Sequence, residues 1–333
     1  MTTVDMRVVG GKLRPFDTFR DLGELAELIG AAFGDDLDIS GRVALAEMRR
    51  YARLWPLNWF AHAVLLSGSP RTSGFVWIED GHVVGNISLR RTFEWGGFLI
   101  GNVAVRPDWQ GRGIGSALME AALQELAARG AYWVGLEVRD DNLVARRLYD
   151  RFGFREVGRK LCMVRPTGST DAPEPPTALR LRRGCHGDSI VLTQMMHASV
   201  PKGLRSFLEL RDTDYRPSFE RTLDRLIEGV RESWWVAEQD QSIVGGVRVV
   251  RERGRRLDRI EVLAAPESQG EVAATLVWKG TTALRRRICR PIETFLIEES
   301  GPLVQVFESA GFCRAQTLIQ MRRNVGRHVA VSD

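Results

Sequence analysis

The chain has 333 residues, and at roughly 100–200 residues per domain this length predicts two domains. Its hydrophobic fraction of 44% and charged fraction of 27% are those of a folded globular protein, which excludes a mainly disordered chain. The net charge of +5 comes without a block of like charge, so it does not indicate a nucleic-acid-binding surface.

Alternating strand and helix signals in the first half predict a mixed α/β layer structure. The first expected elements are a strand over 6–13, helices over 21–33 and 41–53, and strands over 75–79 and 82–90. The last two flank Asp80-Gly81, a dipeptide typical of a hairpin turn. The later elements are a strand over 98–105, a helix over 114–129, a strand over 132–138, a short helix over 143–152 and a strand over 154–164.

A composition change divides the chain. Residues 165–178, RPTGSTDAPEPPTA, are rich in Pro, Ser, Thr and Gly and carry no apolar periodicity, which predicts an extended linker. We therefore expect one domain at 1–164, a second at 179–323 and a tail at 324–333.

A glycine-dense turn joins the strand at 98–105 to the helix that follows. Its sequence, Gln110-Gly111-Arg112-Gly113-Ile114-Gly115, opens the helix directly after Pro107. Glycines allow positive φ and a close ligand approach, and the free N–H groups of a first helical turn attract anions. Arg112 can add a charge-assisted contact. The turn lacks the Gly-Lys-Ser/Thr of a Walker loop and the glycine spacing of a dinucleotide fingerprint.

The motif V-x-V-x-P followed by Q-x-x-G-x-G resembles the pyrophosphate-binding motif of the GNAT acyltransferase superfamily. The downstream pattern Asn142, Tyr149 and Gly153-Phe154 matches a second signature of that family, and the resemblance covers residues 6–164. It implies two neighbouring strands that separate after a bulge and hold acetyl-CoA. The coenzyme-binding residues that it implies are Val103, Ala104, Val105, Gly111, Arg112, Gly113, Ile114, Gly115, Ser116 and Asn142.

Transfer of an acetyl group to an amine needs a base, because an alkylamine with a pKa of roughly 10.4 arrives protonated at neutral pH. Glu137 lies at the predicted end of its strand, five residues before Asn142, as in family members that acetylate protein N-terminal amines. We expect it to act as the base; the alternative is a strand-end carboxylate that pairs with Arg139. By resemblance Tyr149 protonates the departing thiolate; the alternative is a buried tyrosine that supports the fold.

The second half repeats the order of elements, with strands expected near 179–182, 234–238 and 243–250 and helices near 188–198 and 219–229. When the two halves are aligned on the prolines at 107 and 266, Val272 falls on Gly113. A β-branched residue such as valine resists positive φ. Glu271 falls on Arg112 and puts a negative charge where a phosphate would lie. When the two halves are aligned on the glycines at 153 and 311, Phe307 falls on the acid candidate Tyr149. In the same alignment Ser300 falls on the helix cap Asn142, and Phe295 falls on the base candidate Glu137.

We therefore expect a degenerate second GNAT-like domain, in a tandem layout similar to that of the mycothiol synthase family. That family keeps its activity in the C-terminal copy, whereas the intact motifs here are in the N-terminal copy. The resulting prediction is an acetyl-CoA-dependent N-acetyltransferase that acts by direct attack on a small-molecule amine. Alternatives are a peptide or protein N-terminal amine as the acceptor, a non-catalytic acyl-CoA-binding regulator, or a nucleotide-binding dehydrogenase.

The remaining expectations concern partners and surroundings. Four scattered cysteines and five histidines predict no metal site, and the absence of a long apolar run predicts no membrane span and a cytoplasmic protein. Residues 33–36 and 54–60 are candidates for the acceptor pocket, although caps and interdomain packing explain them as well. The two like domains are compatible with a monomer or a homodimer.

Overall fold

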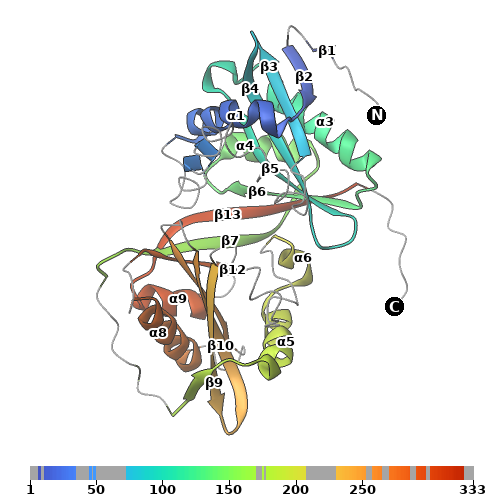
Figure 1. The fold of residues 1–333 in the computed structure, drawn as a ribbon. Coiled ribbons are helices and arrows are strands. Elements are labelled where there is room, and N and C mark those ends of the chain that lie inside the picture. The colour runs from blue at the N-terminus through green and yellow to red at the C-terminus, as the bar shows by residue number, and fades with distance from the viewer. Residues whose placement is uncertain are drawn as a thin grey trace. The chain divides into compact units, whose positions relative to one another are not determined.

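The computed structural model describes residues 7–8, 11–34, 45–46, 48–49, 73–169, 175, 178–207, 230–252, 257–264, 270–285, 290–297 and 301–325 (Figure 1). The chain divides into two compact units. Unit 1 consists of Met1–Glu156 and Met321–Asp333, and unit 2 consists of Val157–Gln320.

Unit 1 is a strongly bent sheet with helices on both faces. Its strands are β1 (Arg7–Val8), β2 (Gly11–Pro15), β3 (Ser73–Glu79), β4 (His82–Arg91), β5 (Gly97–Val105), β6 (Trp133–Arg139) and the end of β13 (Cys313–Asn324), hydrogen-bonded in that order. Its helices are α1 (Thr18–Phe33), the 3₁₀ turn η2 (Pro107–Trp109), α3 (Ile114–Ala128) and α4 (Leu143–Arg151). The expected hairpin is confirmed, since β3 and β4 pair across Asp80 and Gly81 with φ of 49° and 83°. The expected strand at 6–13 instead consists of two short antiparallel strands.

The two faces of this sheet can be assigned from neighbouring residues. Ala104 of β5 belongs to the core cluster of α1, which includes Leu25 and Leu28. A Cβ placed on Gly85, which pairs with the next residue of β5, would meet α3 side chains within about 3 Å. Because successive strand residues point to opposite faces, α1 and α3 cover opposite faces of the sheet.

Unit 2 repeats this arrangement. Its strands are the start of β13, then β7 (Arg155–Arg165), β12 (Ile292–Ile297), β11 (Asp258–Ala264), β10 (Ser242–Glu252), β9 (Val230–Gln239) and β8 (Arg180–Arg183), in that hydrogen-bonded order. Its helices are η3 (His186–Asp188), α5 (Ser189–Ser199), α6 (Lys202–Arg205), α8 (Glu271–Arg285) and α9 (Gly301–Ser309). The helix expected at 219–229 lies outside the described residues. A mixed α/β structure in both halves is confirmed.

The sequence predicted that the first domain ends at residue 164 and that the second begins at residue 179. The boundaries between the two units instead fall within strands β7 and β13. Residues 160–165 of β7 pair with β12 and complete the sheet of unit 2. At the other end of the chain, Arg322 lies over the ring of Trp133 at 4.3 Å, and the N–H of Val325 donates to the carbonyl of Tyr132 at 2.9 Å. Each unit is thus completed by a strand segment that follows the other half in sequence.

An ion pair at the start of each unit repeats as well. In unit 1 the guanidinium of Arg14 donates two hydrogen bonds of 2.6 Å to Asp21. In unit 2 Arg182 donates two of 2.8 Å to Asp188, whose carboxylate also accepts from a backbone N–H at 2.7 Å. The first pair joins β2 to α1, and the second joins β8 to η3, which leads into α5. No helix in the described part of the chain is long and apolar enough to cross a membrane.

Candidate functional site

The parallel strands β5 and β6 separate partway along their length. They pair from Gly97 and Trp133 to Ile100 and Leu136, although β5 continues to Val105 and β6 to Arg139. A bulge lies at the same point, since Ser88 pairs with Gly101 and the next pair toward the end of β5 is Asn86 with Ala104. Beyond the bulge the edge of β5 that faces β6 is open, which is the separation that the sequence motif implied.

The ladder shows which backbone groups face this opening. The N–H of Arg106 donates to the carbonyl of Val84 at 2.8 Å, so its peptide faces β4. Peptide direction alternates along an antiparallel strand, which turns Ala104 toward β4 and turns Val103 and Val105 toward the opening. The Val105 carbonyl accepts from the side chain of Gln110 at 3.1 Å. Of the three expected residues, Val103 and Val105 therefore present backbone groups to the opening, whereas Ala104 packs against α1.

Asn86 braces the bulge, and the sequence motifs did not indicate it. Its side-chain amide donates to the carbonyl of Asn102 at 2.9 Å and lies 3.4 Å from the hydroxyl of Ser88. Asn102 has φ of 50°, a conformation that few non-glycine residues adopt. Asn86 is 1% exposed, and its Oδ1 has no hydrogen-bond partner among the described residues. A buried polar side chain therefore holds the backbone that opens the sheet.

The glycine turn leaves the N-terminus of α3 open. Gly111 and Gly113 have φ of 76° and 83°, and a Cβ added at either position would meet no atom within 4 Å. In the described part of the chain no side chain caps this helix, and its first backbone bond runs from Ala117 N–H to the Gly113 carbonyl. The N–H groups of Ile114, Gly115 and Ser116 thus precede the helical hydrogen bonds. Such a turn can bind an anion.

Two side chains of the turn have defined positions. The guanidinium of Arg112 lies 4.4 Å from the ring centre of Trp109 and donates to the carbonyl of Asp108 at 3.1 Å. Ile114 is 4% exposed, and its side chain packs against the sheet at Gly85. Ile114 can therefore offer only its backbone to a ligand, whereas Arg112 is exposed and can turn toward one.

Glu137 is the first residue of β6 beyond the last pair with β5. Its side chain is partly buried, between the buried Leu136 and Val138. Arg139, proposed as an alternative partner, donates to Asp141 at 2.9 and 2.5 Å. The strand thus places one carboxylate at the point where the sheet opens.

Tyr149 and Asn142 lie on α4, the helix that follows β6. Tyr149 is 5% exposed, and its ring packs edge-on against Phe154 with ring centres 6.2 Å apart. Burial raises the pKa of its hydroxyl, which is protonated at neutral pH even without this shift. No hydrogen bond to that hydroxyl comes from the described residues. The Asn142 side chain caps α4 by accepting from Ala145 N–H at 3.0 Å, which leaves its amide N–H₂ to donate elsewhere.

Unit 2 also has parallel strands that separate, since β11 and β12 pair only at Asp258 with Ile292 and at Arg259 with Glu293, but it carries other side chains at the positions of the acid and base candidates. Phe307 occupies the place of Tyr149: it packs edge-on against Phe312, whose N–H donates to its carbonyl at 3.0 Å, as Phe154 does to Tyr149 at 3.1 Å. Phe295 stands where Glu137 would be, with cations 5.0 and 5.3 Å from its ring centre. The expected replacement of both side chains by Phe agrees with these contacts.

Two aligned pairs were wrong. A Cβ on Gly245 would meet Val272 and Leu276, just as one on Gly85 would meet Ile114 and Leu118. Val272 thus takes the place of Ile114 and not of Gly113, and Glu271 takes the place of Gly113 and not of Arg112, because the connection before α8 is shorter than the one before α3. Gly270, the one described glycine of this connection, does not have positive φ. The second turn still lacks the two left-handed glycines.

Two further expectations concern the acceptor pocket and a metal site. Residues 35–36 and 54–60, the acceptor-pocket candidates beyond the end of α1, lie outside the described residues. Within the described residues no group of three or more His, Cys, Asp and Glu side chains could hold a metal ion.

Comparisons with known proteins agree with this geometry. Residues 42–154 match the model of the Acetyltransferase (GNAT) family. The chain is 42% identical over 176 residues to a mycothiol acetyltransferase of Nocardiopsis dassonvillei, which is 49% of this chain and 48% of that protein. It is 47% identical over 56 residues to the [Ribosomal protein bS18]-alanine N-acetyltransferase of Escherichia coli K12, 17% of this chain and 38% of that enzyme. The chain thus spans less than half the length of these curated relatives.

Solved structures extend the likeness to the whole chain. A GCN5-related N-acetyltransferase from Sphaerobacter thermophilus aligns with TM-score 0.70 at 18% identity, over 97% of this chain and 98% of that one. A tandem GNAT protein from the clavulanic acid biosynthesis pathway aligns with TM-score 0.66 at 15% identity, over 96% and 99%. At this identity the likeness concerns the fold. Residues 42–154 thus match the GNAT acetyltransferase family, and the fold of the chain resembles that of tandem GNAT proteins.

Proposed function

We propose that the chain is an acetyl-CoA-dependent N-acetyltransferase whose reaction takes place in unit 1. The observation that carries this proposal is the separation of β5 from β6 beyond Ile100, beside a helix N-terminus with no side-chain cap among the described residues. The separation exposes an edge of β5, and the N-terminus of α3 carries free N–H groups. One short turn connects the two. Unit 2 lacks the glycine turn.

These features fit the two halves of coenzyme A. The backbone groups of Val103 and the N–H of Val105 can pair with the amides of an extended pantetheine chain, as with an added strand. The N–H groups from Gly111 to Ser116 can bind the pyrophosphate, with Arg112 as a further donor. Bound acetyl-CoA would supply the thioester carbonyl. The Asn142 amide lies at the start of α4, where it can donate to a pantetheine carbonyl.

The chain's own groups would then move the protons. Glu137 accepts a proton from the acceptor ammonium, directly or through water, and so produces the nucleophilic amine. As the C–N bond forms and the C–S bond breaks, the Tyr149 hydroxyl donates its proton to the leaving thiolate, and the proton that the attacking nitrogen loses returns through water to Tyr149. The hydroxyl is protonated before this step, as a tyrosine with an ordinary pKa of about 10 is at neutral pH. No covalent bond to the enzyme is needed.

For the acceptor we propose a small-molecule primary amine. The longer of the two alignments is with a mycothiol acetyltransferase, and the tandem fold is shared with a protein of the clavulanic acid biosynthesis pathway. The second candidate is the N-terminal amine of a peptide or protein. It is supported by the alignment with a bS18-alanine N-acetyltransferase and by the spacing of Glu137 from Asn142.

A screen of amines with detection of the released thiol tests the proposal. We expect acetyl-CoA-dependent thiol release with at least one small primary amine, and its loss in Glu137→Gln. Glu120→Gln, which removes an exposed carboxylate from α3, is the matched control and should keep full activity. If acetyl-CoA binds but neither small amines nor N-terminal peptides are acetylated, the chain is an acyl-CoA-binding regulator instead.

A further inference from the structure

Three residues of unit 1 stand side by side on one face of the sheet, at the point where β5 and β6 separate. Ser88 of β4 pairs with Gly101 of β5, and Gly101 and Glu137 are the next residues after the last pair of β5 with β6. Residues at the same level of neighbouring strands point to the same face. Gly101 is exposed, and a Cβ there would meet no atom within 4 Å. The sheet is therefore open between Ser88 and Glu137, and we call this gap the slot.

The slot lies on the face of the sheet that α1 covers. Asn86 pairs with Ala104, which belongs to the core cluster of α1. Ser88 follows Asn86 by two residues on β4, so it points to the same face. The turn proposed for the pyrophosphate leads into α3, which covers the opposite face. A ligand in the slot thus reaches the opening from the side opposite α3.

The slot carries one hydrogen-bond donor and one acceptor. The amides of Asn86 and Asn102 both donate to the Ser88 hydroxyl, at 3.4 and 3.5 Å. A hydroxyl that accepts twice has only its proton left, and this proton has no acceptor among the described residues. The Oδ1 of the exposed Asn102 belongs to the same amide group, and no described residue donates to it. A ligand hydroxyl, which both accepts and donates, can satisfy the two groups together.

Unit 2 fills the equivalent positions with large side chains. Arg248 follows Gly245 by three residues, as Ser88 follows Gly85, and these two glycines meet α8 and α3 in the same way. The partner of Arg248 on β11 is Glu261, and the two side chains form an ion pair at 3.0 Å. They close the gap that serine and glycine leave open in unit 1.

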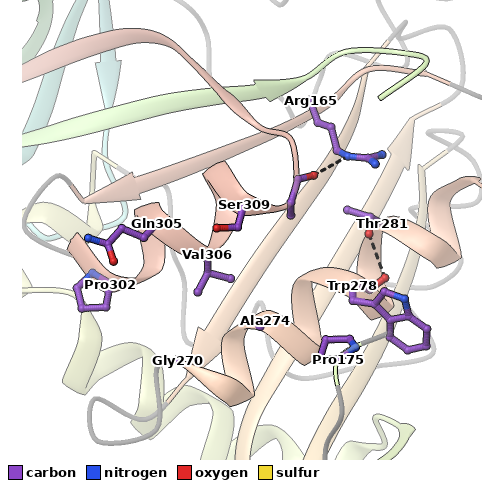
Figure 2. Close-up of a pocket in the computed structure, with 11 residues that line it drawn as sticks. Arg165, Pro175, Gly270, Ala274, Trp278, Thr281, Pro302, Gln305, Val306 and Ser309 are labelled. Carbon is purple, nitrogen blue, oxygen red and sulfur yellow. Dashed lines mark hydrogen bonds between the residues drawn. The ribbon is translucent and has the colours of Figure 1, made fainter. Parts of the chain in front are cut away.

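A cavity of unit 2 lies on the other face of its sheet. It has a volume of about 380 Å³ between α8 and α9, and Ala274, Trp278 and Val306 are among its lining residues (Figure 2). Val247, which precedes Arg248 on β10, packs in the core with α8. Arg248 therefore points away from this cavity, because successive strand residues point to opposite faces. The cavity is thus not the counterpart of the slot.

We propose that the slot binds the acceptor, and that the acceptor is a small primary amine with a hydroxyl group a few bonds from its nitrogen. This rests on the function proposed above, which puts the thioester between β5 and β6. The nitrogen lies at that opening, and the hydroxyl accepts from Ser88 and donates to Asn102, about 4.8 Å away across one strand spacing. A carboxylate in place of the hydroxyl is disfavoured, because it cannot donate to the Asn102 oxygen.

Steady-state acetylation of two matched pairs of amines by the full chain tests the slot. 2-Aminoethanol matches propylamine in size and 3-aminopropan-1-ol matches butylamine, and only the first of each pair carries a hydroxyl. In Ser88→Ala we expect kcat/KM to fall by about tenfold for the hydroxylated amines and by less than about threefold for the alkylamines. Each amine is compared with itself in the wild type, so differences in basicity cancel. Ser73→Ala removes a hydroxyl elsewhere in the same sheet and should keep all four wild-type values.

Gly101→Leu is a second variant, and it fills the slot. Because Gly101 does not have positive φ, a leucine can adopt this backbone conformation. We expect loss of acetylation of both hydroxylated amines, whereas calorimetry should still detect acetyl-CoA binding. Thermal unfolding reports on the fold of each variant.

Two results would overturn the slot alone. One is an equal effect of Ser88→Ala on both members of each pair. The other is a folded Gly101→Leu that acetylates 2-aminoethanol like the wild type. If the wild type releases no thiol with any amine or N-terminal peptide, the function proposed above fails, and the proposed occupant of the slot fails with it.

Discussion

Replacing Tyr149 with Phe removes one hydroxyl from the candidate site and tests its proposed role as the acid. The change should leave the fold intact, because none of the described residues hydrogen-bonds to this hydroxyl. Unit 2 already carries Phe307 at the equivalent position, packed against Phe312 with ring centres 4.9 Å apart. We therefore expect the free energy of unfolding to change by less than about 1 kcal/mol.

The expected effect on turnover is much larger. A general acid contributes roughly 10²–10⁴-fold to the rate, which corresponds to about 3–5 kcal/mol of barrier. The Tyr149 hydroxyl can supply this because a tyrosine, with an ordinary pKa of about 10, is protonated at neutral pH. Acetyl-CoA affinity should stay near that of the wild type, since the coenzyme contacts proposed for the backbone and for Asn142 are unchanged.

The assay combines thiol release at saturating substrates, calorimetry with acetyl-CoA, and urea unfolding. Phe307→Tyr is the reciprocal control: it places a hydroxyl in a fully buried site, so stability should fall by about 1–3 kcal/mol while kcat is kept. A Tyr149→Phe variant that is folded and turns over within about threefold of the wild type would remove Tyr149 from the acid role.

Three further predictions concern the turn, the bulge and the response to acid. Gly113→Ala should weaken acetyl-CoA binding by about tenfold or more. The control Gly130→Ala changes a glycine that also has positive φ and open space around its Cβ, and it should cost only about 1 kcal/mol of stability without weakening binding. Equal acetyl-CoA affinities of the two variants in calorimetry would refute this. Asn86→Ala removes the 2.9 Å bond to the bulge and should lower kcat/KM by about tenfold, with full activity counting against the brace. Arg182 holds the pKa of Asp188 at about 2, below its usual 3.8, so this pair contributes up to about 2 kcal/mol above pH 4 that is lost as the pH falls toward 2. Urea unfolding between pH 2 and 6 should show a flatter acid limb in Asp188→Asn, and an unchanged slope would contradict it.

Much of unit 1 could be predicted from sequence because its signals are local. The turn at Asp80-Gly81, the glycines before α3 and the Asn142 cap each depend on residues a few positions apart. The opening between β5 and β6 followed from a family motif that spans the same short segment. The places of Glu137 and Tyr149 then followed from the strand and the helix on which they lie.

Features that depend on distant residues could not be predicted in this way. The exchange of strand segments joins residue 322 to Trp133, and no local pattern reports such a pairing. Asn86 braces a bulge on the neighbouring strand, so its role is visible only once the register is known. The alignment of Val272 with Gly113 failed because sequence spacing does not reveal a shortened connection, whereas side-chain contacts do.

Amide hydrogen exchange on the full chain, with and without acetyl-CoA, tests the central claim most directly. The account predicts that acetyl-CoA slows exchange at residues 103–105 and 111–116 and leaves residues 260–277 unchanged. Protection that falls on the second segment, or none on the first, would contradict it.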